Sequence, residues 1–222
     1  MGRKVHPKCF RLSTVASWDS LWFSKKRFSE FLQEDEQIRT FLMEKLKEAS
    51  VDTIQIERSV QQVTVTVFSA KPGFIIGRAG AGIEETKTEL TKKVYPGKRV
   101  SLTLNVKEVK KPSLSARIVA QQVASELERR MPFRRSMKSA IDRVMKGGAK
   151  GVRISLGGRL NGADIARTER LLQGQVPLHN LRADINYARV TARTNYGAVG
   201  VRVWINRGEV FERDVKEQPA AV

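Results

Sequence analysis

The sequence has few residues of the kinds that form covalent cross-links or hold transition metals. Its 222 residues include one cysteine, Cys9, so no disulfide can form within the chain. Such cysteine usage is typical of proteins in a reducing cytosol. Because His6 and His179 are the only histidines, the chain also lacks the ligands of a tetrahedral Cys and His zinc site. We therefore expect no disulfide, metal or cofactor.

Long apolar runs and the motifs of nucleotide-using enzymes are also missing. No run approaches the roughly 20 apolar residues of a membrane helix, so we expect no membrane partner. Gly77 and Gly82 have P-loop spacing, but Ile83 occupies the position of the required lysine. Neither histidine has an evident partner, and no serine lies in a nucleophile elbow. We therefore expect a protein that is not an enzyme and takes no small-molecule substrate.

Negative charge is scarce. The chain has 41 Lys and Arg residues against 23 Asp and Glu residues, which gives a net charge of +18. Such an excess indicates a polyanionic partner, which is RNA, DNA or an anionic membrane face. The imbalance is greatest over residues 129–159, where Asp142 is the only acid among ten basic residues. The second half uses mainly arginine, the better bidentate ligand for phosphate.

Hydrophobic patterning predicts an α+β protein in three parts. Residues 1–29 are expected to form a basic arm that lies on nucleic acid, and an organelle transit peptide is the alternative. Residues 30–111 are expected to fold as one domain in the order α-β-β-α-α-β. Its predicted elements are a helix over 31–49, strands over 51–57 and 62–68, a short turn of helix after Pro72-Gly73, a helix over 81–94 and a strand over 100–106.

Residues 112–222 are expected to form a second, two-layer α+β domain with a mostly antiparallel sheet. Its predicted elements are helices over 114–131 and 137–145, a strand over 152–156, a short helix near 163–172 and strands over 181–187 and 199–205. Trp204 alternates with the apolar Val203 and Ile205, so it either faces solvent or a partner, or is covered by another element.

A GxxG loop separates the two later helices of the first domain. Glycine has no Cβ, so this loop lets the backbone approach a nucleic-acid strand, and the next helix points N–H groups at phosphate. A KH module grips about four nucleotides in this way, whereas a tight turn between helices is the alternative reading. The candidate RNA-binding residues of the loop are Gly77, Arg78, Ala79 and Gly80. The residues expected to anchor the loop in the core are Ile75, Ile76 and Ile83.

A second group of candidates lies in the basic window. On a helix, Arg134 and Lys138 are one turn apart and share a face, while Arg135 lies about 100° round. With so few acids nearby we expect these side chains, with Arg130, to follow phosphates, although a solvated basic face is the alternative. The glycine-rich stretch 157–162 is interpreted as a strand-to-helix turn in which Arg159 is a further RNA-binding candidate.

Several ordered motifs together resemble one family across nearly the whole chain. The sequence is similar to bacterial small-subunit ribosomal protein three. The motifs that carry the resemblance are Met1–Pro7, Trp18–Phe23, Gly73–Ile83, Gly158–Glu169, Val176–Ile185 and Tyr196–Val201.

The resemblance implies a type II KH domain joined to a family-specific α+β domain. It implies a cytoplasmic location in the head of the small ribosomal subunit, on ribosomal RNA, beside small-subunit proteins ten and fourteen. It also implies that the basic helix lines the mRNA entry channel and helps open mRNA secondary structure, with Arg134, Arg135 and Lys138 at the matching positions. The alternatives are a free-standing KH regulator that binds RNA away from ribosomes and, more weakly, a nuclease or DNA-repair lyase.

Overall fold

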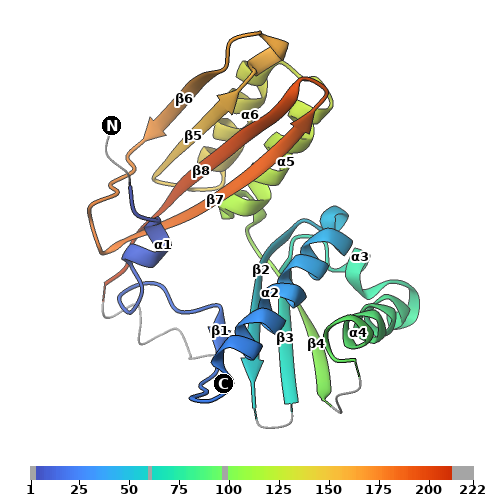
Figure 1. The fold of residues 1–222 in the computed structure, drawn as a ribbon. Coiled ribbons are helices and arrows are strands. Elements are labelled where there is room, and N and C mark those ends of the chain that lie inside the picture. The colour runs from blue at the N-terminus through green and yellow to red at the C-terminus, as the bar shows by residue number, and fades with distance from the viewer. Residues whose placement is uncertain (1–3, 60–61, 97–99, 212–222) are drawn as a thin grey trace. The chain divides into compact units, whose positions relative to one another are not determined.

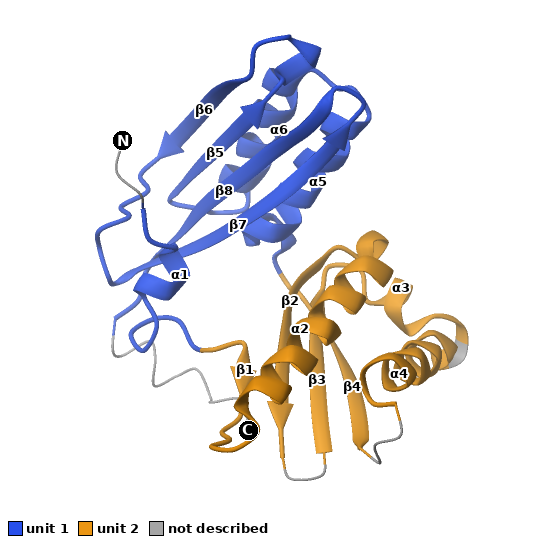
Figure 2. Cartoon of the chain, viewed as in Figure 1, with its two compact units in different colours: residues 1–17, 111–222 blue, residues 18–110 orange. Residues whose placement is uncertain are grey.

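The computed structural model describes residues 4–59, 62–96 and 100–211. The chain divides into two compact units, one of residues 18–110 and one that joins residues 1–17 to residues 111–222 (Figure 2). We call these the KH unit and the C-terminal unit. The segment 1–29, expected to be one basic arm, is therefore divided between them at Ser17.

The KH unit is a four-stranded sheet with helices packed on it. Strands β2 and β3 are antiparallel, whereas β3 and β4 are parallel and β1 lies parallel to β2, in the order β1-β2-β3-β4. This confirms the expected α-β-β-α-α-β order and adds one short strand, β1, before it (Figure 1). The elements are β1 (Ser20–Leu21), α2 (Phe28–Lys45), a 3-10 turn (Lys47–Ala49), β2 (Val51–Arg58), β3 (Gln62–Ser69), α3 (Gly73–Ile76), a 3-10 turn (Arg78–Gly80), α4 (Ala81–Val94) and β4 (Ser101–Glu108).

The core of this unit lies between the sheet and helices α2 and α4. Val63, Val65 and Val67 alternate with threonines in β3 and are buried, as the period of two predicts. From the helices, Ile38 and Leu42 of α2 are completely buried in the same cluster. The spacing of four between them places both on one helix face, which is why α2 packs flat on the sheet.

A buried cluster of charges ties β1, α2 and β2 together. The Arg58 guanidinium donates from Nη1 to Glu34 Oε2 at 2.6 Å and from Nε to Asp35 Oδ1 at 2.9 Å. Asp35 Oδ2 accepts two more bonds, from Ser20 Oγ and Trp22 Nε1, each at 2.8 Å. This explains why the segment from Trp18 onward belongs to the KH unit rather than to a free arm.

The C-terminal unit is an antiparallel sheet in the order β6-β5-β8-β7 with α5 and α6 packed on one face (Figure 1). Val201, Val203 and Ile205 of β8 point toward the helices and are completely buried. The elements are α1 (Pro7–Phe10), a 3-10 turn (Pro112–Leu114), α5 (Ala116–Glu128), α6 (Phe133–Lys146), β5 (Gly151–Gly158), a 3-10 turn (Leu160–Gly162), β6 (Arg167–Gly174), β7 (Ala183–Thr194) and β8 (Gly197–Glu209).

The prediction of a short helix near 163–172 is wrong. Residues 167–174 form strand β6, which pairs with β5 along its whole length, from Gly151 opposite Gly174 to Gly158 opposite Arg167. The local sequence is rich in Ala, Arg, Glu and Leu, which favour helix. The open edge of β5 overrides this local preference, because pairing there supplies a full ladder of backbone hydrogen bonds.

Residues before Ser17 are held to the C-terminal unit by one buried arginine. Arg11 is 2% exposed, and its guanidinium donates to the carbonyl oxygens of Pro177, Leu178 and Asn180 at 3.3, 3.0 and 2.7 Å. His6 adds an edge-on contact with the Tyr187 ring of β7, at 4.9 Å between centroids. In the described part of the chain, no helix is both long and apolar enough to cross a membrane.

We predict that Arg58→Met lowers the free energy of unfolding of the KH unit by about 3–5 kcal/mol, because Glu34 and Asp35 would keep their burial without a countercharge. Urea unfolding followed by tryptophan fluorescence measures this change. The matched control is Arg27→Met, which breaks the exposed pair with Glu30 and should cost less than about 1 kcal/mol. An equal effect of the two substitutions would contradict the prediction.

Candidate nucleic-acid interface

The GxxG loop takes the backbone conformation that its glycines allow. Gly77 has φ +67° and Gly80 has φ +84°, both in the left-handed region that strains residues with a side chain. A Cβ on Gly77 would also lie 3.0 Å from the backbone nitrogen of Gly82. On Gly82 it would lie 2.7 Å from the Ile75 carbonyl oxygen. Helices α3 and α4 are therefore joined by a tight loop whose backbone is left accessible.

The charge at the loop and the start of α4 are both free to meet an anion. Arg78 is exposed, and it has no ion pair with the described residues. Helix α4 begins after Gly80, where no side chain accepts a hydrogen bond from the first turn. Uncapped amide groups and the helix dipole together favour a phosphate at this end. Ala79 lies in the turn, and its side chain is outside the described part of the structure.

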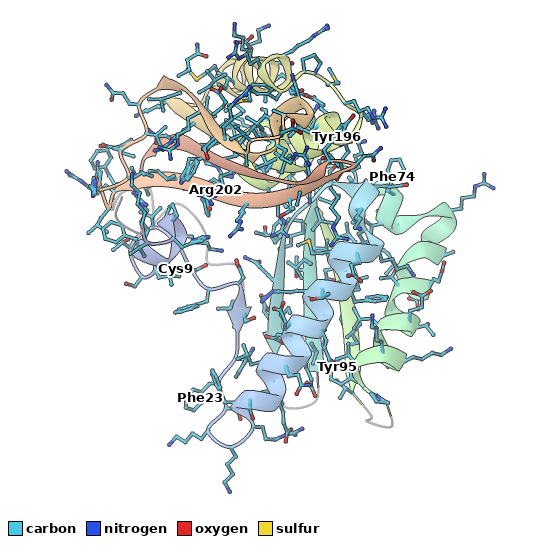
Figure 3. The ribbon with its side chains drawn as sticks, turned by 45° about the horizontal axis from the view of Figure 1, so that its top comes forward. Cys9, Phe23, Phe74, Tyr95, Tyr196 and Arg202 are labelled. Atoms are coloured by element: carbon cyan, nitrogen blue, oxygen red, sulfur yellow. The ribbon has the colours of Figure 1, made fainter. Side chains whose placement is uncertain are left out.

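The apolar residues around the loop are divided between the core and the surface. Ile75 is buried and Ile83 packs against the core, as expected, but Ile76 is 38% exposed and does not anchor the loop. Phe74 is 63% exposed (Figure 3), with Lys71 Nζ at 5.5 Å from its ring centroid. An exposed aromatic ring beside a cation is a surface on which a base can stack. Sequence reasoning missed Phe74 because the motif drew attention only to the glycines.

Helix α6 presents its basic residues on the side away from the core. Arg134, Arg135 and Lys138 are exposed, and neither Arg135 nor Lys138 has an ion pair with any described residue. Arg134 lies 3.9 Å from Glu169 with 74% of its side chain exposed, a geometry that contributes little. The residues that bury the other face are Phe133, Ser136, Met137, Ala140, Ile141 and Val144. The helix therefore holds three cations at fixed spacing.

Arg130 and Arg159 differ from these three. Arg130 is exposed, in the turn between α5 and α6, and has φ +63°, which is unusual for a residue with a side chain. The Arg159 guanidinium is bound within its own loop, where Nε donates to the Ala163 carbonyl at 2.9 Å and Nη2 contacts Asp164 at 3.1 Å. The glycine-rich stretch thus joins two strands, β5 and β6, not a strand and a helix.

A cavity of about 240 Å³ lies at the start of α6, and both Arg130 and Arg159 line it. Asn161 and Tyr196 also line it, together with residues of the turn before α6 and of the turn between β7 and β8. Asn161 Oδ1 accepts from the Phe133 amide at 3.4 Å, so the loop is attached to the first turn of the helix. Neither Asn161 nor Tyr196, the latter labelled in Figure 3, was a candidate from the sequence, because the pairing of β5 with β8 is what brings their two loops together.

Within the described residues, no group of three or more His, Cys, Asp or Glu side chains is placed to hold a metal ion. The candidate residues instead form two surfaces, the GxxG loop on the KH unit and the start of α6 on the C-terminal unit. Both combine exposed cations with a rigid backbone, which is the arrangement that phosphate binding requires.

Two family models match the chain. The KH domain model matches residues 37–114, and the model of the ribosomal protein S3 C-terminal domain matches residues 123–205.

Curated relatives match over almost the full length. The chain is 47% identical over 211 residues to the small ribosomal subunit protein uS3 of Pediococcus pentosaceus, which covers 95% of this chain and 93% of the relative. It is 49% identical over 211 residues to the protein of the same name from Enterococcus faecalis, covering 95% of both chains. It is 47% identical over 221 residues to the protein of the same name from Lactobacillus acidophilus, covering 100% of this chain and 96% of the relative. The GxxG loop, the basic helix and the strands around them therefore belong to a member of the small ribosomal subunit protein uS3 family.

Proposed function

We propose that the protein is a structural constituent of the head of the small ribosomal subunit, in the cytoplasm, where it binds ribosomal RNA and contacts mRNA as it enters. The observation that carries the mRNA contact is the row of exposed cations on α6, two of which have no ion pair with a described residue. Its neighbours would be small-subunit proteins ten and fourteen. The activity is binding and positioning, without a catalytic residue, cofactor or small-molecule substrate.

The basic helix would act on mRNA by charge and shape. Each phosphate that Arg134, Arg135 or Lys138 contacts releases counterions, with a salt slope of about −0.7 per contact on a single strand. Because the other face of α6 is buried, the helix holds the backbone positions of the three cations at a fixed spacing. Cations held in this way stabilise separated strands over a duplex wherever the geometry admits only one strand, so structured mRNA opens without consumption of nucleotide at this site.

The KH unit would hold RNA at the GxxG loop. The glycine backbone admits the strand closely, the start of α4 and Arg78 face its phosphates, and Phe74 offers a ring for a base. Whether the message or ribosomal RNA occupies this loop, the contact chemistry is the same. Arginine and lysine would position the RNA through its phosphate backbone, and glycine would allow the RNA to approach closely.

We predict that the protein stays with the small subunit through a high-salt wash. Sucrose-gradient sedimentation of a cell lysate, with immunoblotting of the fractions, tests this. Retention in stoichiometric amount is expected of an integral subunit protein, whereas a protein held by phosphate contacts alone would be released, because salt weakens each such contact. Release to the top of the gradient would contradict the proposal and would favour a free-standing KH regulator.

Removal of the α6 cations is predicted to slow translation selectively. Arg134→Ala/Arg135→Ala/Lys138→Ala should leave the fold and subunit incorporation intact, since all three side chains are exposed. Ribosomes with this variant should be slower on messages with stable hairpins and unchanged on unstructured messages. The charge-matched control is Lys25→Ala/Lys26→Ala/Lys47→Ala, also at exposed positions. Equal slowing on both kinds of message would refute a role in opening structure.

The loop is tested by adding negative charge at Gly80. Gly80→Asp should weaken binding of the full-length protein to single-stranded RNA by about tenfold, because it places a carboxylate beside phosphate and strains a positive φ. Gly73→Asp is the matched control: a Cβ there meets nothing within 4 Å, and its φ is not positive. Filter binding measures both. If the two variants bind alike, the loop is only a turn between helices.

A further inference from the structure

The face of the C-terminal sheet that α5 and α6 do not cover carries a row of arginines. In β8, Val201 and Val203 point into the core and are completely buried, so Arg202 between them points to the opposite face. The strand register places Arg202 opposite Arg189 of β7 on one side and opposite Ser155 of β5 on the other, and Ser155 is opposite Arg170 of β6. We call this four-strand row, Arg170–Ser155–Arg202–Arg189, the arginine row (Figure 3 labels Arg202).

The arginine row is free of countercharge. Arg170, Arg189 and Arg202 are all exposed, and none of their side chains has an ion pair or hydrogen bond to a described residue. Like charges directly opposite each other on a sheet destabilise it, and Arg189 and Arg202 are such a pair. A β-branched residue would suit either strand position better. The sequence therefore maintains an unfavourable pair that a bound anion would offset.

The row of side chains next to the arginine row, which includes Trp204, indicates that a ligand would be bound through its phosphates and not by stacking of its bases. Trp204 is half-buried, with Arg153 5.0 Å from its ring centroid and the Tyr187 ring at 5.1 Å. Tyr187 in turn contacts His6. The rings of this row are thus occupied by one another and serve as a rigid base beside the arginines. Adjacent strands are about 4.8 Å apart, so the arginine row extends over roughly 14 Å, more than a single phosphate spans.

We propose that the arginine row is a binding surface for the phosphate backbone of ribosomal RNA, distinct from the surface that α6 offers to mRNA. The proposal rests on the proposed place of the chain in the small subunit. The two surfaces lie on opposite faces of one domain, because α6 packs on the other side of the same sheet. A message that runs along α6 would have to pass round the domain to reach the arginines. A segment of ribosomal RNA that is fixed in the subunit can contact the arginine row directly.

The test removes the central pair and leaves the sheet intact. In the full-length protein, Arg189→Thr/Arg202→Thr should weaken binding to a small-subunit rRNA transcript by about tenfold at 0.1 M salt and make the slope of log K against log salt shallower by about 1.4–1.8, as expected for two lost phosphate contacts. Its melting temperature should rise by about 1–3 °C, because the like-charge pair is gone. A purely structural role for these arginines predicts a fall instead.

A charge-matched control separates this surface from net charge. Lys110→Gln/Lys111→Gln removes two positive charges at exposed positions outside the sheet and should change the salt slope by less than half as much. Equal losses for the two variants, or no loss for the arginine variant, would overturn the proposal. Because this measurement uses purified RNA, it tests RNA binding by the arginine row even if sedimentation shows that the protein does not belong to the small subunit.

A photocrosslinker at Leu172 identifies the partner. Leu172 is 61% exposed and is placed by its register with Arg153 on the same face as the arginine row. With benzoylphenylalanine at this position, irradiation of assembled small subunits should link the protein to ribosomal RNA. Crosslinks to mRNA, to a neighbouring protein or to another part of this chain, without crosslinks to ribosomal RNA, would refute the assignment.

Discussion

The scarcity of carboxylates in a chain of net charge +18 constrains every other feature of this structure. A buried guanidinium needs hydrogen-bond partners, and Arg58 and Arg11 obtain them in different ways. Glu34 and Asp35 surround Arg58 inside the KH unit, whereas the Arg11 guanidinium donates to four backbone carbonyls, those of Pro7, Pro177, Leu178 and Asn180. Several cations at the surface, among them Arg135, Lys138 and Arg202, have no ion pair with a described residue. The same imbalance that would destabilise an isolated protein through self-repulsion makes it a ready ligand for a polyanion.

The helix and the strands that carry the unpaired cations fix the spacing of their backbone positions. The three cations of α6 are useful because the opposite side of that helix is fully packed, and the arginine row is useful because four paired strands fix its spacing. The GxxG loop depends on a different property, the absence of a side chain at two positions of positive φ. Each surface therefore joins mobile charged ends to an immobile base, which lowers the entropy lost when RNA binds.

The sequence predicted most of the KH unit because its local signals agree with its tertiary structure. The helix over 81–94 has the predicted bounds, limited by Gly80 and Pro96, and the alternating valines of β3 are buried, although Thr66 between them is buried as well. The prediction at β6 failed because the local composition favours a helix, whereas the segment pairs with the edge of β5. Arg159 also donates from Nη1 to the Tyr196 carbonyl at 3.4 Å, a contact with a residue remote in sequence. The arginine row could not be predicted without the register of four strands.

The anchoring of the first residues by Arg11 has a consequence for synthesis of the chain. Three of its four carbonyl acceptors lie at Pro177, Leu178 and Asn180, so the beginning of the protein cannot dock until the chain is nearly finished. The KH unit is continuous in sequence and can fold meanwhile. At about 5–20 residues per second, the amino-terminal segment waits on the order of ten to thirty seconds. During that interval the basic amino-terminal segment lacks its anchor on the C-terminal unit and remains open to other partners.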